Sequence, residues 1–110
     1  MASSALIDME MVEQGAEALG REEMIKLCRL MANTCLADAR RLAVLDAAEK
    51  RRTLHSLAGA AASCGAERLA VEARRLERSP TWSDDDFETL CNVALATQEW
   101  AIRDLPFILS

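Results

Sequence analysis

The sequence contains no tyrosine and few other aromatic residues, with two tryptophans and two phenylalanines among 110 residues. Scarce aromatics together with abundant alanine and leucine disfavour a β-sandwich and favour closely packed helices. Proline occurs only at Pro80 and Pro106, where we expect helices to end. No apolar run reaches the roughly 18 residues that a membrane-spanning helix needs, so we expect no association with a membrane.

The N-terminus also lacks the basic segment followed by an apolar segment that marks a secretory signal. We therefore expect a cytoplasmic protein. A chain of 110 residues predicts a single domain, residues 1–110, and a monomer is the simplest oligomeric state.

The cysteines form no CxxC pair, which argues against a zinc or redox site. They lie on or near apolar helical stripes, at Cys28, Cys35, Cys64 and Cys91. Because a free thiol behaves as a small apolar group, buried reduced thiols are favoured over a disulfide framework.

Charge is unevenly distributed along the chain. The net charge is −5, yet residues 40–78 hold nine basic and five acidic residues. The overall negative charge and the lack of a basic stripe with interleaved aromatics argue against nucleic-acid binding. A basic segment in an acidic protein suits an acidic protein partner or a phosphoryl group, although solubility alone would also explain it.

Apolar residues at spacings of three and four predict helices separated by short turns. The predicted helices span residues 8–19, 21–45, 46–65, 66–78 and 83–105, after an irregular end at residues 1–5. Asp8, Asp46 and Ser83 are good N-caps, while Gly20 and Gly65 suit helix ends.

Helices joined by short loops pack antiparallel. The sequence therefore predicts an all-α fold, an antiparallel up-down four-helix bundle with a short additional N-terminal helix that covers one end. Three adjacent aspartates at residues 84–86 suit the dipole of the last helix better than a metal site, since neighbours on a helix point in different directions.

His55 is the only histidine, and it is predicted to face solvent from the third helix. At about 100° per residue, Leu54, Leu57 and Ala61 share an apolar stripe that His55 does not join. Gly59 lies one turn later on the outward face. Because glycine inside a helix costs about 1 kcal/mol relative to alanine, we interpret Gly59 as clearance for a partner that approaches the imidazole. For His55 alone, a solvated residue without a task is the simpler interpretation.

The segment HSLAGAAASCGAERLAVEARRLE resembles the signature of histidine-containing phosphotransfer (HPt) domains. That signature has a histidine, an apolar residue, glycine, small residues, a Gly-Ala pair, a second apolar residue and a later acid or amide. The matching residues here are His55, Leu57, Gly59, Ala60, Gly65, Ala66, Leu69 and Glu77. The long second helix and the acidic start of the last helix also match the layout of the family.

The chain departs from this signature at Ala58, where the family usually has lysine or another basic residue. In the family, that residue is thought to hold or neutralise the phosphoryl group. Arg51 and Arg52 lie four and three residues before His55, on the same helix face. They are candidates to supply the missing charge.

The resemblance implies a phosphorelay carrier. It would accept a phosphoryl group on His55 and exchange it with an aspartate of a response-regulator receiver domain, or receive it from a hybrid histidine kinase. A neutral imidazole has one free nucleophilic nitrogen. The receiver would supply Mg²⁺ and most of the catalysis, so the domain would need no metal or other cofactor and would not be an enzyme itself.

The predicted site divides into a phosphate environment and a docking surface. The phosphate environment consists of Arg51, Arg52 and Gly59, and the partner contacts of Ala58, Ala62, Ser63 and Glu77, the last carried over from the family signature. Met9 and Val12 are weaker docking candidates, since packing explains them at least as well. The alternative function is a helical adaptor that binds a signalling partner through the same face without accepting phosphate, which Ala58 favours.

Overall fold

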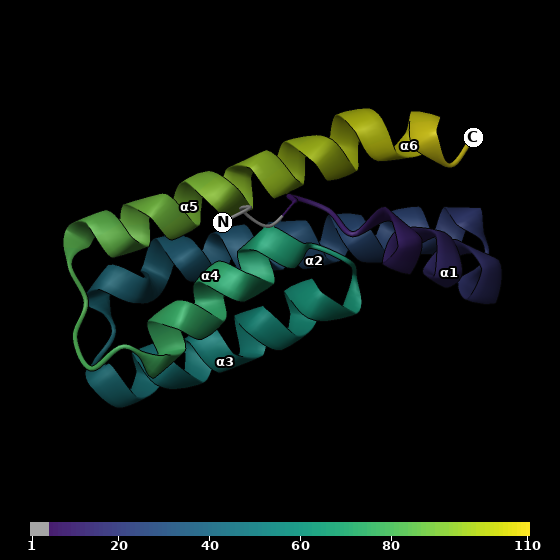
Figure 1. Ribbon diagram of the computed structural model, residues 1–110. Coiled ribbons are helices and arrows are strands. Elements are labelled where there is room, and N and C mark those ends of the chain that lie inside the picture. The colour runs from purple at the N-terminus through teal and green to yellow at the C-terminus, as the bar shows by residue number, and fades with distance from the viewer. Residues whose placement is uncertain (1–4) are drawn as a thin grey trace.

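The computed structural model describes residues 5–110, which form helices and connecting turns (Figure 1). Residues 1–4 of the predicted irregular end lie outside the described residues. The helices are α1 (Met9–Leu19), α2 (Arg21–Arg41), α3 (Ala47–Ser63), α4 (Glu67–Arg78), α5 (Asp84–Glu99) and α6 (Leu105–Ile108). A 3₁₀ turn, η1 (Leu42–Val44), follows α2, and a π-helical turn, η2 (Trp100–Asp104), joins α5 to α6. The predicted all-α class is confirmed, and none of the described helices is long and apolar enough to span a membrane.

Three helices, α1, α3 and α5, begin directly after the predicted capping residues. The Asp8 and Asp46 carboxylates each accept a hydrogen bond from the backbone N–H three residues later, at 3.3 and 2.8 Å. Ser83 and Asp86 form a reciprocal capping box at the start of α5. The hydrogen bond from the Ser83 backbone N–H holds the pKa of the Asp86 carboxyl below its usual range. This part of the aspartate cluster therefore stabilises a helix start.

α2, α3, α4 and α5 contribute most of the buried core, together with residues of α1, η2 and α6. α2 packs against α3 and α5, and α4 packs against the same two helices. The fully buried leucines come from α3, α4 and α5 and from the short elements η1 and α6: Leu42, Leu54, Leu57, Leu69, Leu76, Leu90 and Leu105. The α3–α4 contact is the most extensive, because small buried residues line it: Ala58, Ala61, Ala66, Ala70 and Ala73. Close packing of α3 on α4 determines the shape of the surface around His55.

α1 lies along α2 and is anchored to the turn between α3 and α4 (Figure 1). Gly65 in that turn has φ +78°, and its carbonyl accepts a hydrogen bond from the Asp8 N–H at 2.7 Å. A Cβ at Gly65 would lie 2.9 Å from the Asp8 carbonyl oxygen, so both the backbone conformation and the space favour glycine. Val12 is fully buried, and Met9 is half-buried against the core. The packing interpretation therefore holds for Val12.

Two predicted helix ends differ from the structure. The last turn of the second helix tightens into η1, so that α2 itself stops at Arg41. At the C-terminus the helix continues beyond Leu105 to Ile108, although Pro106 lies within it. Proline lacks an N–H and clashes with the carbonyl four residues earlier in a regular α-helix. The wider turn of η2 directly before α6 relieves this clash.

All four cysteines are unpaired thiols. Cys28, Cys35 and Cys64 are buried, and Cys91 is half-buried. Burial raises the pKa of Cys35 to about 12, so this thiol stays protonated at neutral pH. The preference for buried thiols over disulfides is confirmed for three of them, while Cys91 keeps partial access to solvent.

Candidate functional site

The His55 side chain projects from the outer face of α3 with 78% of its surface exposed. Its helix neighbours Leu54 and Leu57 are only 0% and 1% exposed. α3 therefore buries its leucines against the other helices and turns the imidazole outward. The exposure predicted for His55 is confirmed.

Glu77 of α4 fixes the orientation of the imidazole ring. The Nδ1 atom of His55 lies 2.9 Å from Oε2 of Glu77. An ionised carboxylate only accepts hydrogen bonds, so the proton of the neutral ring resides on Nδ1. Nε2 then keeps its lone pair and has no hydrogen-bond partner among residues 5–110. A nitrogen nucleophile is thus held in one orientation at the surface.

Arg51 of α3 binds the backbone carbonyl of Glu77 at the end of α4. Its guanidinium donates hydrogen bonds to the carbonyl oxygens of Glu77 and Ser79, at 2.6 and 3.0 Å. The guanidinium carbon also lies 4.5 Å from the centre of the Trp82 ring. A cation is favourable at the C-terminal end of α4, where backbone carbonyls lack partners within the helix. Glu77 is consequently held by α3 at two points, through its carbonyl oxygen and through its carboxylate.

Gly59 leaves open space on the outward side of α3. A Cβ placed on Gly59 would meet no atom within 4 Å outside the adjoining helix backbone. The surface one turn beyond His55 is therefore open at this position, because no side chain lies where a Cβ of residue 59 would be. Open space is present at Gly59, and its use by an approaching partner stays a prediction.

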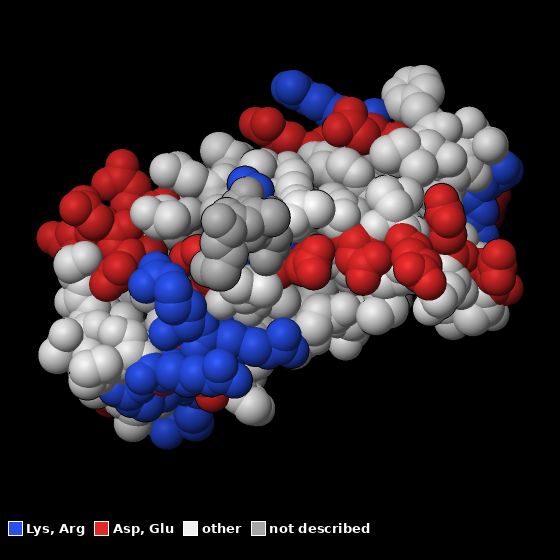
Figure 2. All heavy atoms as spheres, in the orientation of Figure 1, with Lys and Arg blue, Asp and Glu red and all other residues white. Residues whose placement is uncertain are grey.

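A hollow on the α4 side of the imidazole brings the two helices together. It is lined by His55, Ala58, Gly59, Arg74, Glu77 and Arg78. Figure 2 shows basic side chains gathered over this part of the molecule, whereas acidic side chains cover the start of α5. An exposed nitrogen nucleophile beside two arginines can accept and hold a phosphoryl group.

A family model described as Hpt domain matches residues 23–100. The chain belongs to the Hpt domain family. No curated protein and no solved structure matches the chain. The matched part of this Hpt domain contains His55, Glu77 and the whole of the hollow between α3 and α4.

The structure corrects the interpretation of Ala58 as a partner contact. Ala58 is only 2% exposed, because α4 packs directly over it. In this Hpt domain the third position after the histidine thus faces the neighbouring helix and forms part of the floor of the hollow. A long basic side chain from this position would have to emerge between α3 and α4.

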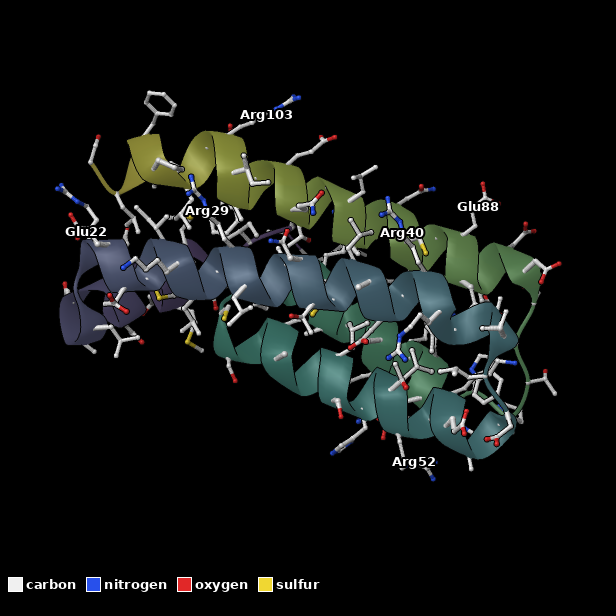
Figure 3. All side chains as sticks on the ribbon, turned by 180° about the vertical axis from the view of Figure 1, so that it is seen from behind. Glu22, Arg29, Arg40, Arg52, Glu88 and Arg103 are labelled. Atoms are coloured by element: carbon white, nitrogen blue, oxygen red, sulfur yellow. The ribbon has the colours of Figure 1, made fainter. Side chains whose placement is uncertain are left out.

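The two proposed phosphate arginines of α3 have different surroundings. Arg51 was one of two candidates to supply charge to the phosphoryl group, and its guanidinium is engaged with the end of α4. Arg52 projects outward from α3 (Figure 3). It lines a separate hollow on the other side of His55, together with Arg51, Ser56 and Glu77. The sequence could not distinguish them, since both fall one turn before the histidine.

Ala62 and Ser63, the remaining predicted partner contacts, face different sides of α3. Ala62 is half-buried and lines a hollow with Ala70 and Arg74 on the α4 side. Ser63 is exposed and lines an apolar hollow on the α2 side. Its hydroxyl donates to the Gly59 carbonyl at 2.9 Å. The predicted contacts therefore lie on two surfaces that meet along α3 rather than on one.

Sequence reasoning missed Arg74 and Arg78. Both are exposed, and neither has a hydrogen-bond or ion-pair partner within the described part of the chain. Arg74 lies three residues before Glu77 and four residues before Arg78, so the three side chains share one side of α4. That spacing was the available signal, but only the packing of α4 against α3 shows that this side faces His55. Among residues 5–110, no group of three or more His, Cys, Asp or Glu side chains could hold a metal ion.

Proposed function

We propose that this Hpt domain is a histidine phosphotransfer protein of a multistep two-component phosphorelay. It carries a phosphoryl group on His55 between receiver-domain aspartates, or from a histidine kinase system to a response regulator. The observation that supports this function is the pairing of an outward-facing imidazole with Glu77, at 2.9 Å, on a helix face left open by Gly59.

The proposed transfer uses Nε2 as the nucleophile. Nε2 attacks the phosphorus atom of the receiver's aspartyl phosphate, an N–P bond forms, and the P–O bond to the aspartate breaks. The aspartate leaves as a carboxylate with the bonding electron pair. The ring becomes a cation because Nδ1 keeps its proton, and the Glu77 carboxylate stabilises that positive charge. The reverse sequence returns the phosphoryl group to another aspartate.

The domain contributes a positioned nucleophile, and we assign most of the catalysis to the receiver. Mg²⁺ would be bound by the receiver's own carboxylates, so the domain is a carrier rather than an enzyme and needs no cofactor of its own. We further propose that α2–α5 form the antiparallel up-down four-helix bundle of such carriers, with α1 as the additional helix. The protein would act as a monomer in the cytoplasm, and its receiver would dock over His55, Gly59 and the hollows on both sides of α3.

An adaptor that binds a receiver without accepting phosphate is the second candidate. The observation that favours it is Ala58, which replaces the usual basic residue of the family with a buried methyl group. The adaptor would use the same docking face, so binding alone does not distinguish the two functions.

Incubation with purified receiver domains, phosphorylated beforehand with acetyl phosphate and Mg²⁺, tests the proposal. We expect label to appear on the wild-type protein in an acid-labile, base-stable form and to be absent from His55→Gln. Glu88→Gln, a change at an exposed residue of α5, serves as the control and should still be labelled. Binding of a receiver without transfer to the wild type would support the adaptor and contradict the carrier.

A further inference from the structure

The phosphotransfer site has no basic side chain on α3 that points into the hollow beside His55. Ala58 forms part of the floor, and Arg51 is engaged with backbone carbonyls. Arg52 lies on the other side of the ring. A phosphoryl group on Nε2 carries up to two negative charges and would lie near the Glu77 carboxylate, which repels it. Positive charge must therefore come from elsewhere if the phosphorylated form is to be stabilised.

We propose that Arg74 of α4, with Arg78 beside it, forms the binding site for the phosphoryl group of phosphorylated His55. The inference rests on the proposed function. It adds the location of the positive charge that stabilises the phosphoryl group. The charge that the family usually places on the histidine helix, at the position of Ala58, is supplied here by the neighbouring helix.

The position of Arg74 on α4 supports this assignment. Arg74 precedes Glu77 by three residues, and side chains at this spacing are neighbours, with Cβ atoms about 5–6 Å apart. Glu77 contacts the imidazole at 2.9 Å, so Arg74 starts one turn away from the ring. Arg78 follows Glu77 directly and lines the same hollow. A flexible guanidinium stem spans such a distance, and its planar donors match phosphate oxygens in pairs.

The surroundings of Arg74 leave its side chain able to move. Besides the hollow at His55, Arg74 lines a second hollow along α3 and α4, next to Ala62 and Ala70. Arg74 therefore lies between these two hollows. By contrast, Arg75, its neighbour in the chain, makes ion pairs with Glu72 at 3.1 Å and with Asp86 at 3.7 Å. The two consecutive arginines thus differ in position and in available charge, which makes Arg75 a matched control.

The small side chain of Ala58 fits this arrangement. Because Ala58 is 2% exposed beneath the hollow, it leaves room above it for a phosphoryl group and a guanidinium. A lysine at this position would fill part of that room and bring its own charge. We therefore expect the Ala58→Lys change to compensate for loss of Arg74.

Chemical phosphorylation followed by phosphorus NMR tests the site without a partner protein. Potassium phosphoramidate transfers its phosphoryl group to Nε2; its P–N bond breaks, ammonia leaves and a new N–P bond forms. The charged groups that line the hollow of the product are Glu77, Arg74 and Arg78 on α4. Arg51 and Arg52 on α3 line the hollow on the other side of the ring. A nearby cation favours the dianion and lowers the second phosphoryl pKa, so Arg74→Gln should raise that pKa by about 0.5 unit.

Matched variants separate this role from a general effect of charge. Arg75→Gln removes the same charge from the same helix and should leave the phosphoryl titration unchanged. Arg74→Lys should restore most of the wild-type value, and Ala58→Lys combined with Arg74→Gln should move the pKa back toward it. Arg78→Gln should produce a smaller shift in the same direction as Arg74→Gln. Transfer from a phosphorylated receiver should fall about tenfold in Arg74→Gln.

The outcomes distinguish the inference from the function on which it rests. A phosphorylated wild type together with an Arg74→Gln protein that titrates identically would overturn the Arg74 site and leave the carrier function intact. Equal shifts in Arg74→Gln and Arg75→Gln would also overturn it, because they would indicate a diffuse field. A wild type that is labelled neither by phosphoramidate nor by any phosphorylated receiver would overturn the carrier function and this inference together.

Discussion

The two sides of α3 differ in chemistry although they belong to one helix. Toward α4, the surface beside His55 carries a carboxylate and two arginines above a small alanine floor. Toward α2, the surface is an apolar hollow lined by Leu27, Leu30, Met31, Thr34, Ala60, Ser63 and Cys64. Leu30 at this hollow is 65% exposed, and together with the other apolar residues of the lining it forms an exposed apolar patch. Under the proposed function, we expect group transfer to use the α4 side and contact with a protein partner to use the α2 side.

Gly59 lies between these two surfaces, and changing it should have the largest effect. Gly59→Leu should lower transfer from a phosphorylated receiver by about 100-fold, because a small misplacement of the reacting groups is that costly. Labelling by phosphoramidate should persist, since a small donor needs no flat approach. The helix itself should gain about 0.5–1 kcal/mol from replacement of glycine, so circular dichroism should show an intact bundle.

Gly59→Ala is the matched control for this change and should transfer at close to the wild-type rate. The Cβ that it adds meets only open space. Normal transfer by Gly59→Leu would show that an approaching receiver does not need open space at residue 59. The two surfaces would then not be separated by this position.

Glu77→Gln should have an intermediate effect that is confined to the α4 side. A glutamine amide can either donate to Nδ1 or accept from it, so it no longer selects the tautomer with a free Nε2. It also removes the negative charge that stabilises the cationic ring. We expect phosphorylation to slow by about tenfold with both phosphoramidate and receiver donors, measured as initial labelling rates.

Glu72→Gln is the control, because Glu72 pairs with Arg75 rather than with the imidazole. A rate loss in Glu77→Gln that appeared only with the protein donor would show that Glu77 contacts the partner instead of tuning the ring. That result would assign Glu77 to partner binding and not to the chemistry of the imidazole.

Leu30→Asp should have the smallest effect, on affinity alone. Placing a charge in the apolar hollow should weaken receiver binding by about 1 kcal/mol, roughly fivefold, in a titration calorimetry experiment. Labelling by phosphoramidate should not change. Ile102→Asp, which places the same charge at another exposed aliphatic residue (49% exposed), should bind normally; equal weakening in both variants would show that the α2 side has no special role.

Local signals made much of the fold predictable. Capping by Asp8, Asp46 and Ser83 and the left-handed glycine at the end of α3 depend on a few neighbouring residues, so the sequence alone identified them. The outward orientation of His55 was equally accessible, because it follows from the spacing of the leucines around it. Helix periodicity carries this information within a single turn.

The rest of the site depended on how separate helices pack. The burial of Ala58 and the position of Arg74 require the register between α3 and α4, which no local pattern encodes. The carbonyl partners of Arg51 lie 26 and 28 residues further along the chain. Its position one turn from His55 therefore wrongly suggested a role beside the phosphoryl group. The continuation of the helix to Ile108 was not predictable, because a proline usually marks the end of a helix. It depends on the wider turn of η2 before Pro106.

The single available nitrogen of His55 constrains how partners can use this protein. With Nδ1 occupied by Glu77, the proposed carrier function would require a donor and an acceptor to reach the same atom from the same direction. Under that function they could not both be bound at this atom, so each exchange would consist of two consecutive encounters. An abundant acceptor that lingers after unloading would delay the next loading event, and the lifetime of that spent complex would then limit the flow of signal.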